Sequence, residues 1–173
     1  MKKMYKYLFV LPLLFLTFAM HAEEESLTSH LDSIVLGSGC FWGAEKGYEQ
    51  IDGVENAVSG YSDGFGIKPS YREITKTKNK FNKNNFAEVV MVNFNRSNLS
   101  LESILQHFFE SHDPTQLNRQ GNDVGTQYRS GAYVFNQEQK SAATDSLTSY
   151  QQNLNKSGFG AITTEIEPAG PFY

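Results

Sequence analysis

Residues 33–51 place an apolar strand directly before a helix, with a glycine-rich turn and the chain's single cysteine, Cys40, between them. Gly37 and Gly39 allow the backbone to turn tightly and leave the sulfur accessible. The start of a helix carries unpaired N–H groups and the positive end of the helix dipole, which favour a thiolate over a thiol. The turn therefore makes Cys40 a candidate nucleophile, the alternative being a buried, unreactive cysteine.

Hydrophobic periodicity predicts one mixed domain in which strands and helices alternate. The expected strands cover about residues 33–39, 54–61, 86–95, 131–136 and 161–167, and the expected helices cover about residues 41–51, 100–112 and 137–156. Asn136 and Gln139 have the spacing of a capping box before the last helix. The order of elements predicts an α+β fold with a ferredoxin-like β-α-β-β-α-β sandwich core, an added helix and strand, and long loops.

Two long polar segments separate these elements. Residues 62–85 include the low-complexity string KTKNKFNKNN at 76–85, which is typical of a mobile surface loop. Residues 112–131 mix loop-forming residues with Arg119, Tyr128 and Arg129, a content that favours an ordered loop that helps to build a site. Tyr61 and Tyr71 could supply further hydroxyl donors, the alternative being ordinary half-buried packing.

The N-terminus resembles a secretory signal. Lys2, Lys3 and Lys6 precede an almost wholly apolar run at residues 8–20, which is too short to span a bilayer comfortably. We expect a signal peptide over 1–22 that is cleaved after Ala22, a single catalytic domain over 23–173, and a periplasmic or secreted protein. An uncleaved membrane anchor is the alternative.

The net charge and the single cysteine disfavour several classes of function and of stabilising bond. Loss of residues 1–22 removes three lysines and no acid, which takes the formal charge from −4 to −7. An acidic chain without a basic stripe is a poor candidate for binding nucleic acid or an anionic membrane, so membrane contact is expected only through an uncleaved N-terminus. A single cysteine excludes an internal disulfide. The four histidines have no metal-ligand spacing, so no metal site is expected.

A carboxylate lies within the most regular apolar strand pattern. Period-2 alternation puts Glu88 on the same face as Val90, Val92 and Phe94. A desolvated glutamate resists ionisation, so its pKa should rise and it could act as an acid near neutral pH. The alternative, which the pattern leaves open, is that Glu88 lies at the strand's end, solvated or paired with a lysine.

Three strings together resemble one family. GCFWGAE at 39–45, AEVV at 87–90 and HDPTQLNRQGNDVGTQYRS at 112–130 are similar to the peptide methionine sulfoxide reductase A family, and the resemblance extends over about residues 34–173. It implies reduction of the S epimer of methionine sulfoxide, free or in proteins, to methionine. The expected substrates are therefore proteins or peptides that contain methionine S-sulfoxide.

The resemblance also implies roles for particular residues. Cys40 corresponds to the nucleophile, which would be left as a sulfenic acid. Glu88 corresponds to the acid that protonates the sulfoxide oxygen, and Tyr71 and Tyr128 to the phenols that hydrogen-bond that oxygen. The apolar pocket for the substrate's methyl group corresponds to Phe41 and Trp42, and a polar residue of the substrate site to Asp123.

The chain departs from the family pattern at several places. The family often has resolving cysteines near its C-terminus and continues beyond the point where these residues end, so we expect a truncated domain without a resolving thiol. The implied reductant is then an external thiol, such as a thioredoxin-like protein, with no bound cofactor. GYSDG at 60–64 replaces a GYAGG-like turn, Phe86 stands where the family usually has histidine, and the preceding loop is longer.

Two hypotheses of different classes follow. The first is an exported, monomeric, single-cysteine sulfoxide reductase that repairs oxidised envelope proteins. The second is a truncated, catalytically weak or inactive paralogue that binds oxidised methionine segments or scavenges oxidants. An unrelated cysteine-dependent acyl-transfer enzyme is disfavoured, because no histidine is placed as a base for Cys40.

Overall fold

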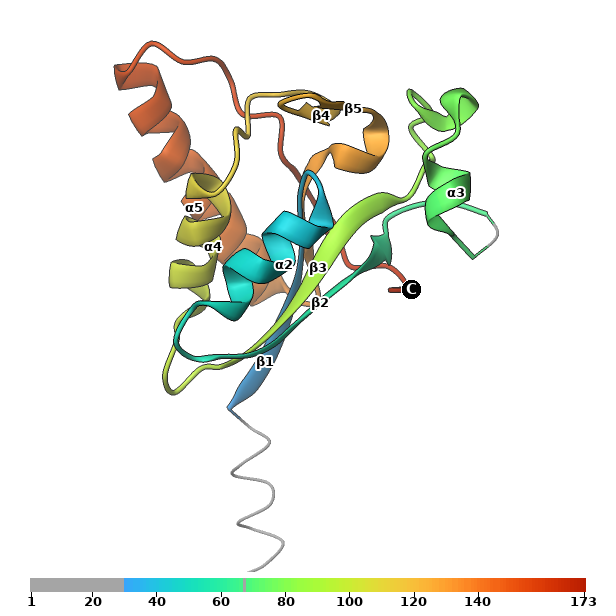
Figure 1. Ribbon diagram of the computed structural model, residues 1–173. Helices are drawn as coiled ribbons and strands as arrows, with labels where there is room; N and C mark the ends of the chain where they lie inside the picture. Colours follow the sequence, from blue (N-terminus) through green and yellow to red (C-terminus); the bar gives the residue numbers. More distant parts are fainter. Residues whose placement is uncertain (1–29, 67) are drawn as a thin grey trace, which may run out of the picture. The chain divides into compact units, whose positions relative to one another are not determined.

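The computed structural model describes residues 30–66 and 68–173, of which residues 32–173 form one compact unit (Figure 1). The strands are β1 (Leu31–Ser38), β2 (Val54–Ser62), β3 (Ala87–Asn95), β4 (Arg119–Gln120), β5 (Asp123–Val124), β6 (Ser130–Val134) and β7 (Glu165–Pro168). The helices are α2 (Phe41–Glu49), α3 (Tyr71–Ile74), α4 (Leu101–Glu110) and α5 (Gln137–Lys156), with the 3-10 turns η1 (Thr77–Asn79) and η2 (Thr126–Tyr128).

The main sheet has the strand order β2-β3-β1-β6-β7. β1 pairs with β6 in antiparallel register, as does β2 with β3, whereas β7 joins β6 in parallel. β1, α2, β2, β3, α4 and β6 follow in that order along the chain, with the shorter elements in the loops between them, and this β-α-β-β-α-β order is the ferredoxin-like plan. The predicted fold class is confirmed, and the added helix and strand are α5 and β7.

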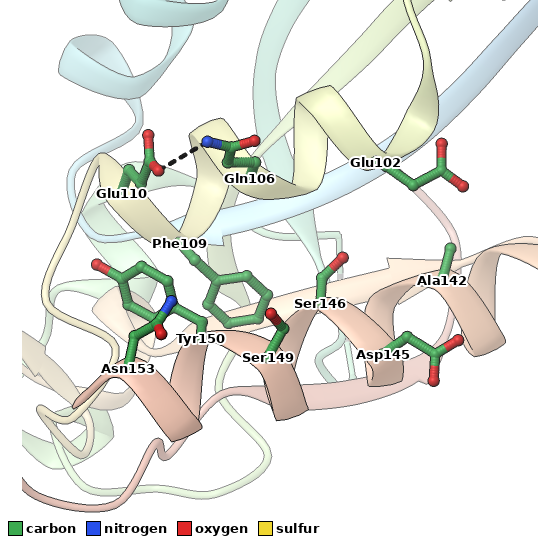
Figure 2. Close-up of a pocket in the computed structure, with 10 residues that line it drawn as sticks. All are labelled: Glu102, Gln106, Phe109, Glu110, Ala142, Asp145, Ser146, Ser149, Tyr150 and Asn153. Atoms are coloured by element: carbon green, nitrogen blue, oxygen red, sulfur yellow. Dashed lines mark hydrogen bonds between the residues drawn. The ribbon is translucent and has the colours of Figure 1, made fainter. Parts of the chain in front are cut away.

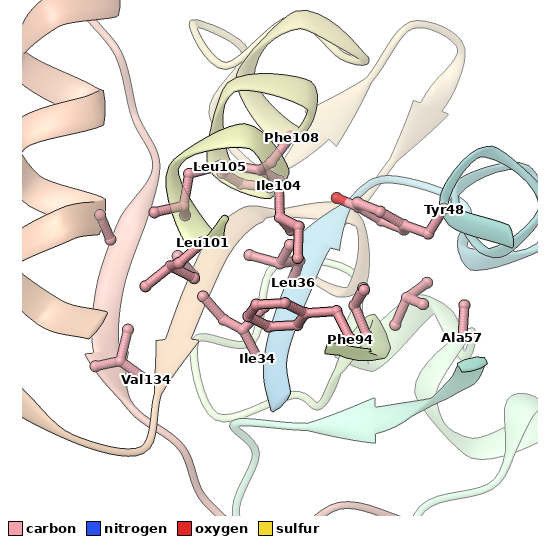
Figure 3. Close-up of a cluster of buried hydrophobic side chains, with 14 of the residues drawn as sticks. Ile34, Leu36, Tyr48, Ala57, Phe94, Leu101, Ile104, Leu105, Phe108 and Val134 are labelled. Carbon is pink, nitrogen blue, oxygen red and sulfur yellow. The ribbon is translucent and has the colours of Figure 1, made fainter. Parts of the chain in front are cut away.

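Helices α2, α4 and α5 bury one face of the sheet (Figure 1). The apolar positions of α4 recur at helical spacing and meet the alternating apolar residues of β1 and β3, which builds the main core (Figure 3). Fully buried members of this core include Ile34, Leu36, Phe94, Ile104, Leu105 and Phe108. Glu88 lies on the same strand as this core, so the fold places a carboxylate next to apolar side chains.

The last residues of the chain lie against the edge strand β2. Tyr61 and Tyr173 exchange two backbone hydrogen bonds, each with an N···O distance of 3.0 Å. The Phe172 ring lies close to the Gly60 backbone, where an added Cβ would come within 2.3 Å of a ring carbon. A side chain at position 60 would therefore displace these terminal residues from the strand that carries Tyr61.

Two of the predicted helices begin with a side-chain cap, and the cap at Asn136 is the one that the sequence predicts. The Ser100 hydroxyl accepts a hydrogen bond from the Ser103 N–H at 3.1 Å, and Asn136 Oδ1 accepts one from the Gln139 N–H at 2.9 Å. The second half of the predicted capping box is wrong. The Gln139 side chain is buried, accepts from the Phe135 N–H and donates to the Ser33 carbonyl, so it ties α5 to β1 instead.

The Asn136 cap should contribute measurably to stability. Replacing Asn136 with alanine leaves the Gln139 N–H without its side-chain acceptor, so we expect a loss of about 1 kcal/mol in the free energy of unfolding. Urea denaturation measures it, with Ser149→Ala at an exposed position within α5 as the control. Equal stability of the two variants would contradict the cap assignment.

The polar segment at 62–85 contains more structure than its composition predicts. It includes α3 and η1, and the Asn85 amide donates to the Ile74 carbonyl at 3.0 Å. Thr126 reaches it from the second long loop, through its N–H to the Lys80 carbonyl and its hydroxyl to the Asn82 carbonyl. The prediction of a simple surface loop missed these contacts because they come from a segment more than forty residues away in the sequence.

The last predicted strand begins too early. Residues 161–164 do not join the sheet, because Ile162 donates its N–H to the Gln151 side chain and Thr163 donates its N–H to the Pro114 carbonyl. Within the described residues, no helix is long and apolar enough to cross a bilayer. The predicted signal peptide at residues 1–22 lies outside the described residues.

Candidate active site

Cys40 occupies the N-cap position of α2, with φ −61° and ψ 117°, and its side chain is exposed. The turn before it requires glycine. Gly39 has φ +97°, and a Cβ added there would lie 2.7 Å from Gln120 Cβ. Glycine at this position therefore lets the β4–β5 hairpin pack directly against the turn that presents the sulfur.

Glu88 lies beside the start of the same helix. Its side chain is buried, with 1% of the residue exposed, and its Oε2 accepts a hydrogen bond from the Phe41 N–H at 3.3 Å. Its Oε1 has no hydrogen-bond partner among the described residues. Of the two alternatives that the sequence left open, the structure shows the buried one, and the acid is bonded to the residue that follows Cys40.

Burial sets the protonation of this carboxyl group. Desolvation raises the pKa of Glu88 to about 7, the Phe41 hydrogen bond opposes this rise, and the negative charge of Asp123 adds to it. A carboxyl group with this pKa is protonated in about half of the molecules near neutral pH and can donate a proton there.

Two tyrosines, Tyr61 and Tyr128, lie within electrostatic reach of Glu88. Burial, together with electrostatic interactions with Glu88, Tyr71 and Asp123, raises the pKa of Tyr128 to about 12. Burial also raises the pKa of Tyr61, as do its interactions with Glu88 and Tyr71. These phenols therefore stay protonated at neutral pH and can donate hydrogen bonds. The structure thus places the predicted Tyr128 and Asp123 within electrostatic reach of Glu88, and the predicted Tyr71 within reach of Tyr128.

Aromatic rings form an apolar surface next to Cys40. Phe41 is buried, whereas Trp42 is 74% exposed, and their rings stack with centroids 6.4 Å apart at an interplanar angle of 6°. Tyr61 contacts Phe41 from β2, with ring centroids 5.4 Å apart. The family resemblance gave Tyr61 no role, although the sequence had marked its hydroxyl as a possible donor.

Two cavities differ in their relation to these residues. One of about 300 Å³ lies between α2, α4 and the β4–β5 hairpin, and Cys40 and Asp123 line it together with His107, Ser111 and Gln120. Glu88 does not line it, so this cavity approaches the sulfur from outside the cluster of acid and phenols. The sequence did not single out Gln120, because nothing in its neighbourhood along the chain indicates that it packs against Gly39.

A second cavity, of about 480 Å³, lies between α4 and α5 (Figure 2). Six of its ten lining residues carry a carboxylate or a hydroxyl group, and the Gln106 amide donates to Glu110 Oε1 at 2.9 Å. None of the predicted site residues lines it, so its greater volume does not make it the better candidate. Among residues 30–66 and 68–173, no cluster of three or more histidine, cysteine, aspartate or glutamate residues is arranged to hold a metal ion.

Sequence comparison gives one family. A family model described as peptide methionine sulfoxide reductase matches residues 32–173. Among curated proteins, the chain is 43% identical over 153 residues to peptide methionine sulfoxide reductase MsrA 1 of Caulobacter vibrioides, covering 88% of this chain and 68% of the relative. It is 46% identical to MsrA 1 of Synechocystis, covering 83% of this chain and 62% of that relative. The chain thus spans about two thirds of the length of these relatives.

Solved structures agree with the sequence comparison. Methionine sulfoxide reductase A of Corynebacterium diphtheriae superposes with a TM-score of 0.74 at 36% identity, over 83% of this chain and 69% of that one. Mxr1 from Saccharomyces cerevisiae, solved in complex with Trx2, superposes with a TM-score of 0.60 at 25% identity, over 84% of this chain and 81% of that one. The chain belongs to the peptide methionine sulfoxide reductase family of oxidoreductases.

Proposed function

We propose that this chain reduces the S epimer of methionine sulfoxide, free or in proteins, to methionine through a sulfenic acid on Cys40. The proposal rests chiefly on the hydrogen bond from the Phe41 N–H to Glu88 Oε2. Phe41 follows the exposed Cys40 in the sequence, so this bond holds a buried acid close to the thiol. Family membership supports the same reaction.

The reaction needs a nucleophile and a proton donor at the same sulfoxide. The Cys40 sulfur attacks the sulfoxide sulfur, and Glu88 gives its proton to the sulfoxide oxygen as the S–O bond weakens. The resulting hydroxyl group passes to Cys40 Sγ as the bond between the two sulfurs breaks, so that methionine leaves and Cys40 becomes a sulfenic acid. The proton of the thiol returns Glu88 to its protonated form, and the substrate gains the two electrons that the thiol loses. Buried Glu88 is suited to this role because its pKa of about 7 keeps a substantial protonated fraction near neutral pH.

The neighbouring residues supply binding and orientation. Tyr71 and Tyr128 donate hydrogen bonds to the sulfoxide oxygen, whose negative charge rises before the proton is transferred. Phe41 and Trp42 receive the substrate's methyl group on their stacked rings. Asp123 lies at the polar side of the substrate site and keeps the Glu88 carboxyl group protonated to a higher pH.

An external thiol closes the cycle. Cys40 is the single cysteine of the 173 residues. Two equivalents of an external thiol would return the sulfenic acid to a thiol, with release of water and formation of a disulfide. A thioredoxin-like protein is the proposed reductant, in line with the solved complex of Mxr1 with Trx2. We further propose a monomeric domain over 23–173 that acts on oxidised envelope proteins after export.

Epimer selection tests this proposal. The purified protein, supplied with excess dithiothreitol, is incubated separately with the S and R epimers of N-acetyl methionine sulfoxide, and methionine derivative is quantified by chromatography. We expect steady consumption of the S epimer alone. Release from neither epimer by a folded protein would refute the proposed activity and favour the inactive paralogue, while equal release from both would refute the epimer assignment.

Trp42 should contribute to substrate binding without contributing to stability. Its ring is largely exposed, so Trp42→Ala removes contact surface for the substrate's methyl group but little folded-state packing. We expect KM to rise by about 10-fold, which corresponds to roughly 1.4 kcal/mol of lost binding, with a stability change within about 0.5 kcal/mol. Steady-state kinetics measure the first, and Leu117→Ala, at another exposed apolar residue, is the control. An unchanged KM would remove Trp42 from the substrate site.

A further inference from the structure

Arg129 is the most extensively bonded side chain in the loops around the site. It is buried, with 6% of its side chain exposed, yet all five of its N–H donors have protein acceptors. Nε donates to Glu165 Oε2 at 3.1 Å, and Nη1 donates to the Asn85 carbonyl at 3.0 Å and the Thr126 carbonyl at 2.8 Å. Nη2 donates to the Asp63 carbonyl and, at 2.7 Å, to Asp63 Oδ2.

These acceptors belong to four separate segments. Asp63 follows the end of β2, two residues after Tyr61, and Asn85 precedes β3, three residues before Glu88. Thr126 begins the η2 turn that ends with Tyr128, and Glu165 begins β7. One guanidinium group therefore joins the chain segments that carry the proposed proton donor and one of the proposed phenols.

The contacts of Arg129 with Asp63, Asn85, Thr126 and Glu165 together form the Arg129 junction. Charge and backbone conformation strengthen it. Two carboxylates, Asp63 and Glu165, face the single positive charge, and burial makes each hydrogen bond stronger than it would be in water. Asp63 has φ +51°, in the left-handed region that favours glycine. The Arg129 bonds to both its carbonyl and its carboxylate hold it there.

Because every donor of Arg129 is already engaged by the protein, the guanidinium has none left for a substrate. Its influence must pass through the residues that it fixes. Tyr128 is its immediate neighbour, and the same side chain bonds the Thr126 carbonyl two residues before Tyr128. A shift of η2 relative to β3 would change the separation of the Tyr128 hydroxyl from Glu88.

We propose that Arg129 is a positioning residue for the reaction, which locks the η2 turn to the start of β3 so that Tyr128 and Glu88 act on the same sulfoxide oxygen. The inference rests on the proposed function. It predicts that loss of the junction slows the chemical step and leaves substrate binding nearly unchanged, because the aromatic surface of Phe41 and Trp42 does not depend on it.

A double-mutant cycle tests this inference. Single-turnover rates with N-acetyl methionine S-sulfoxide are measured for the wild type, Arg129→Lys, Tyr128→Phe and the double variant. Lysine keeps the charge but has three donors on one atom, so it cannot reach all four segments. We expect Arg129→Lys to lower the saturating rate by about 10- to 10²-fold with little change in half-saturating concentration. In the Tyr128→Phe background, the same change should cost no more than about twofold.

The control is Arg96→Lys, because Arg96 also pairs with two carboxylates, Asp32 and Glu138, but lies away from the site. Its rate should match the wild type. Equal slowing by Arg129→Lys in both backgrounds, or no slowing, would overturn the inference, since a purely structural role does not depend on the Tyr128 hydroxyl. A wild type that releases no methionine would instead overturn the proposed function, and this inference with it.

Should Arg129→Lys fail to fold, Asp63→Asn carries the same test. Asparagine tolerates the left-handed backbone and keeps an acceptor for Arg129, but it removes one of the two facing charges. We expect a several-fold lower saturating rate that again nearly disappears in the Tyr128→Phe background. Additive losses for Asp63→Asn and Tyr128→Phe would count against the positioning role.

Discussion

Glu88→Gln is expected to slow single-turnover formation of methionine by about 10²–10⁴-fold, because the variant keeps the shape of the side chain but has no acidic proton to give. The measurement is rapid mixing of the enzyme with saturating N-acetyl methionine S-sulfoxide, followed by quantification of the methionine derivative. Glu49→Gln, at the exposed C-terminal end of α2 and away from the proposed proton transfer, is the matched control. Equal rates for Glu88→Gln and the wild type would remove the acid from the mechanism.

The pH dependence of the single-turnover rate tests the role of Glu88 in an independent way. Burial raises the pKa of Glu88 to about 7, and the protonated form is the active one. The pH response of the nucleophile is common to the wild type and to Glu88→Gln, so it cancels in the ratio of their rates. That ratio should fall about tenfold per pH unit once the pH exceeds roughly 7. A ratio that stays constant from about pH 6 to about pH 9 would contradict the assignment of Glu88 as the acid.

Glu88→Gln should also stabilise the protein at alkaline pH. The pKa of Glu88 is raised from 4.5 in the unfolded chain to about 7 in the folded one, so folding favours the protonated form. Stability contributed by this carboxyl group is complete below pH 4.5 and is lost as the pH rises to about 7. Removing the charge should therefore raise the free energy of unfolding by about 1–3 kcal/mol at pH 8. Urea denaturation at pH 5 and pH 8 measures the difference.

Cys40→Ser is expected to abolish methionine formation. A serine hydroxyl is a far weaker nucleophile and cannot become a sulfenic acid. Because Cys40 is exposed, the variant should unfold within about 0.5 kcal/mol of the wild type, so lost activity cannot be attributed to lost structure. The assay is the same single-turnover measurement. Methionine release by Cys40→Ser at a rate near that of the wild type would place the nucleophile elsewhere.

Local patterns in the sequence were enough to predict most of the strands and helices. Period-2 alternation in β3 and helical spacing in α4 each record which side chains face the core, so strand and helix types followed from short windows. The same alternation placed Glu88 among Val90, Val92 and Phe94. It could not decide whether the carboxyl group was solvated, because that depends on α2 packing over the strand and on the Phe41 hydrogen bond.

The features that the sequence did not predict are contacts between distant segments. The Arg129 junction joins residues separated by up to 66 positions, and its acceptors are mainly backbone carbonyls, which no residue type reveals. The composition of the string at 76–85 predicted a mobile loop. The hydrogen bonds from Thr126 to the Asn79 and Asn82 carbonyls come from a distant segment, so the local sequence could not reveal them. Gln139 appeared to be half of a capping box, yet its burial against Ser33 decides its partner.

The proposed reaction depends on transfer of the sulfoxide oxygen to Cys40, which a single-turnover experiment measures. The protein is mixed with excess N-acetyl methionine S-sulfoxide in the absence of any reductant, and both the methionine derivative and the remaining thiol are counted. We expect about one methionine released for each thiol lost, with no further turnover until an external thiol is added. Thiol loss without methionine release, or methionine release with the thiol intact, would contradict it.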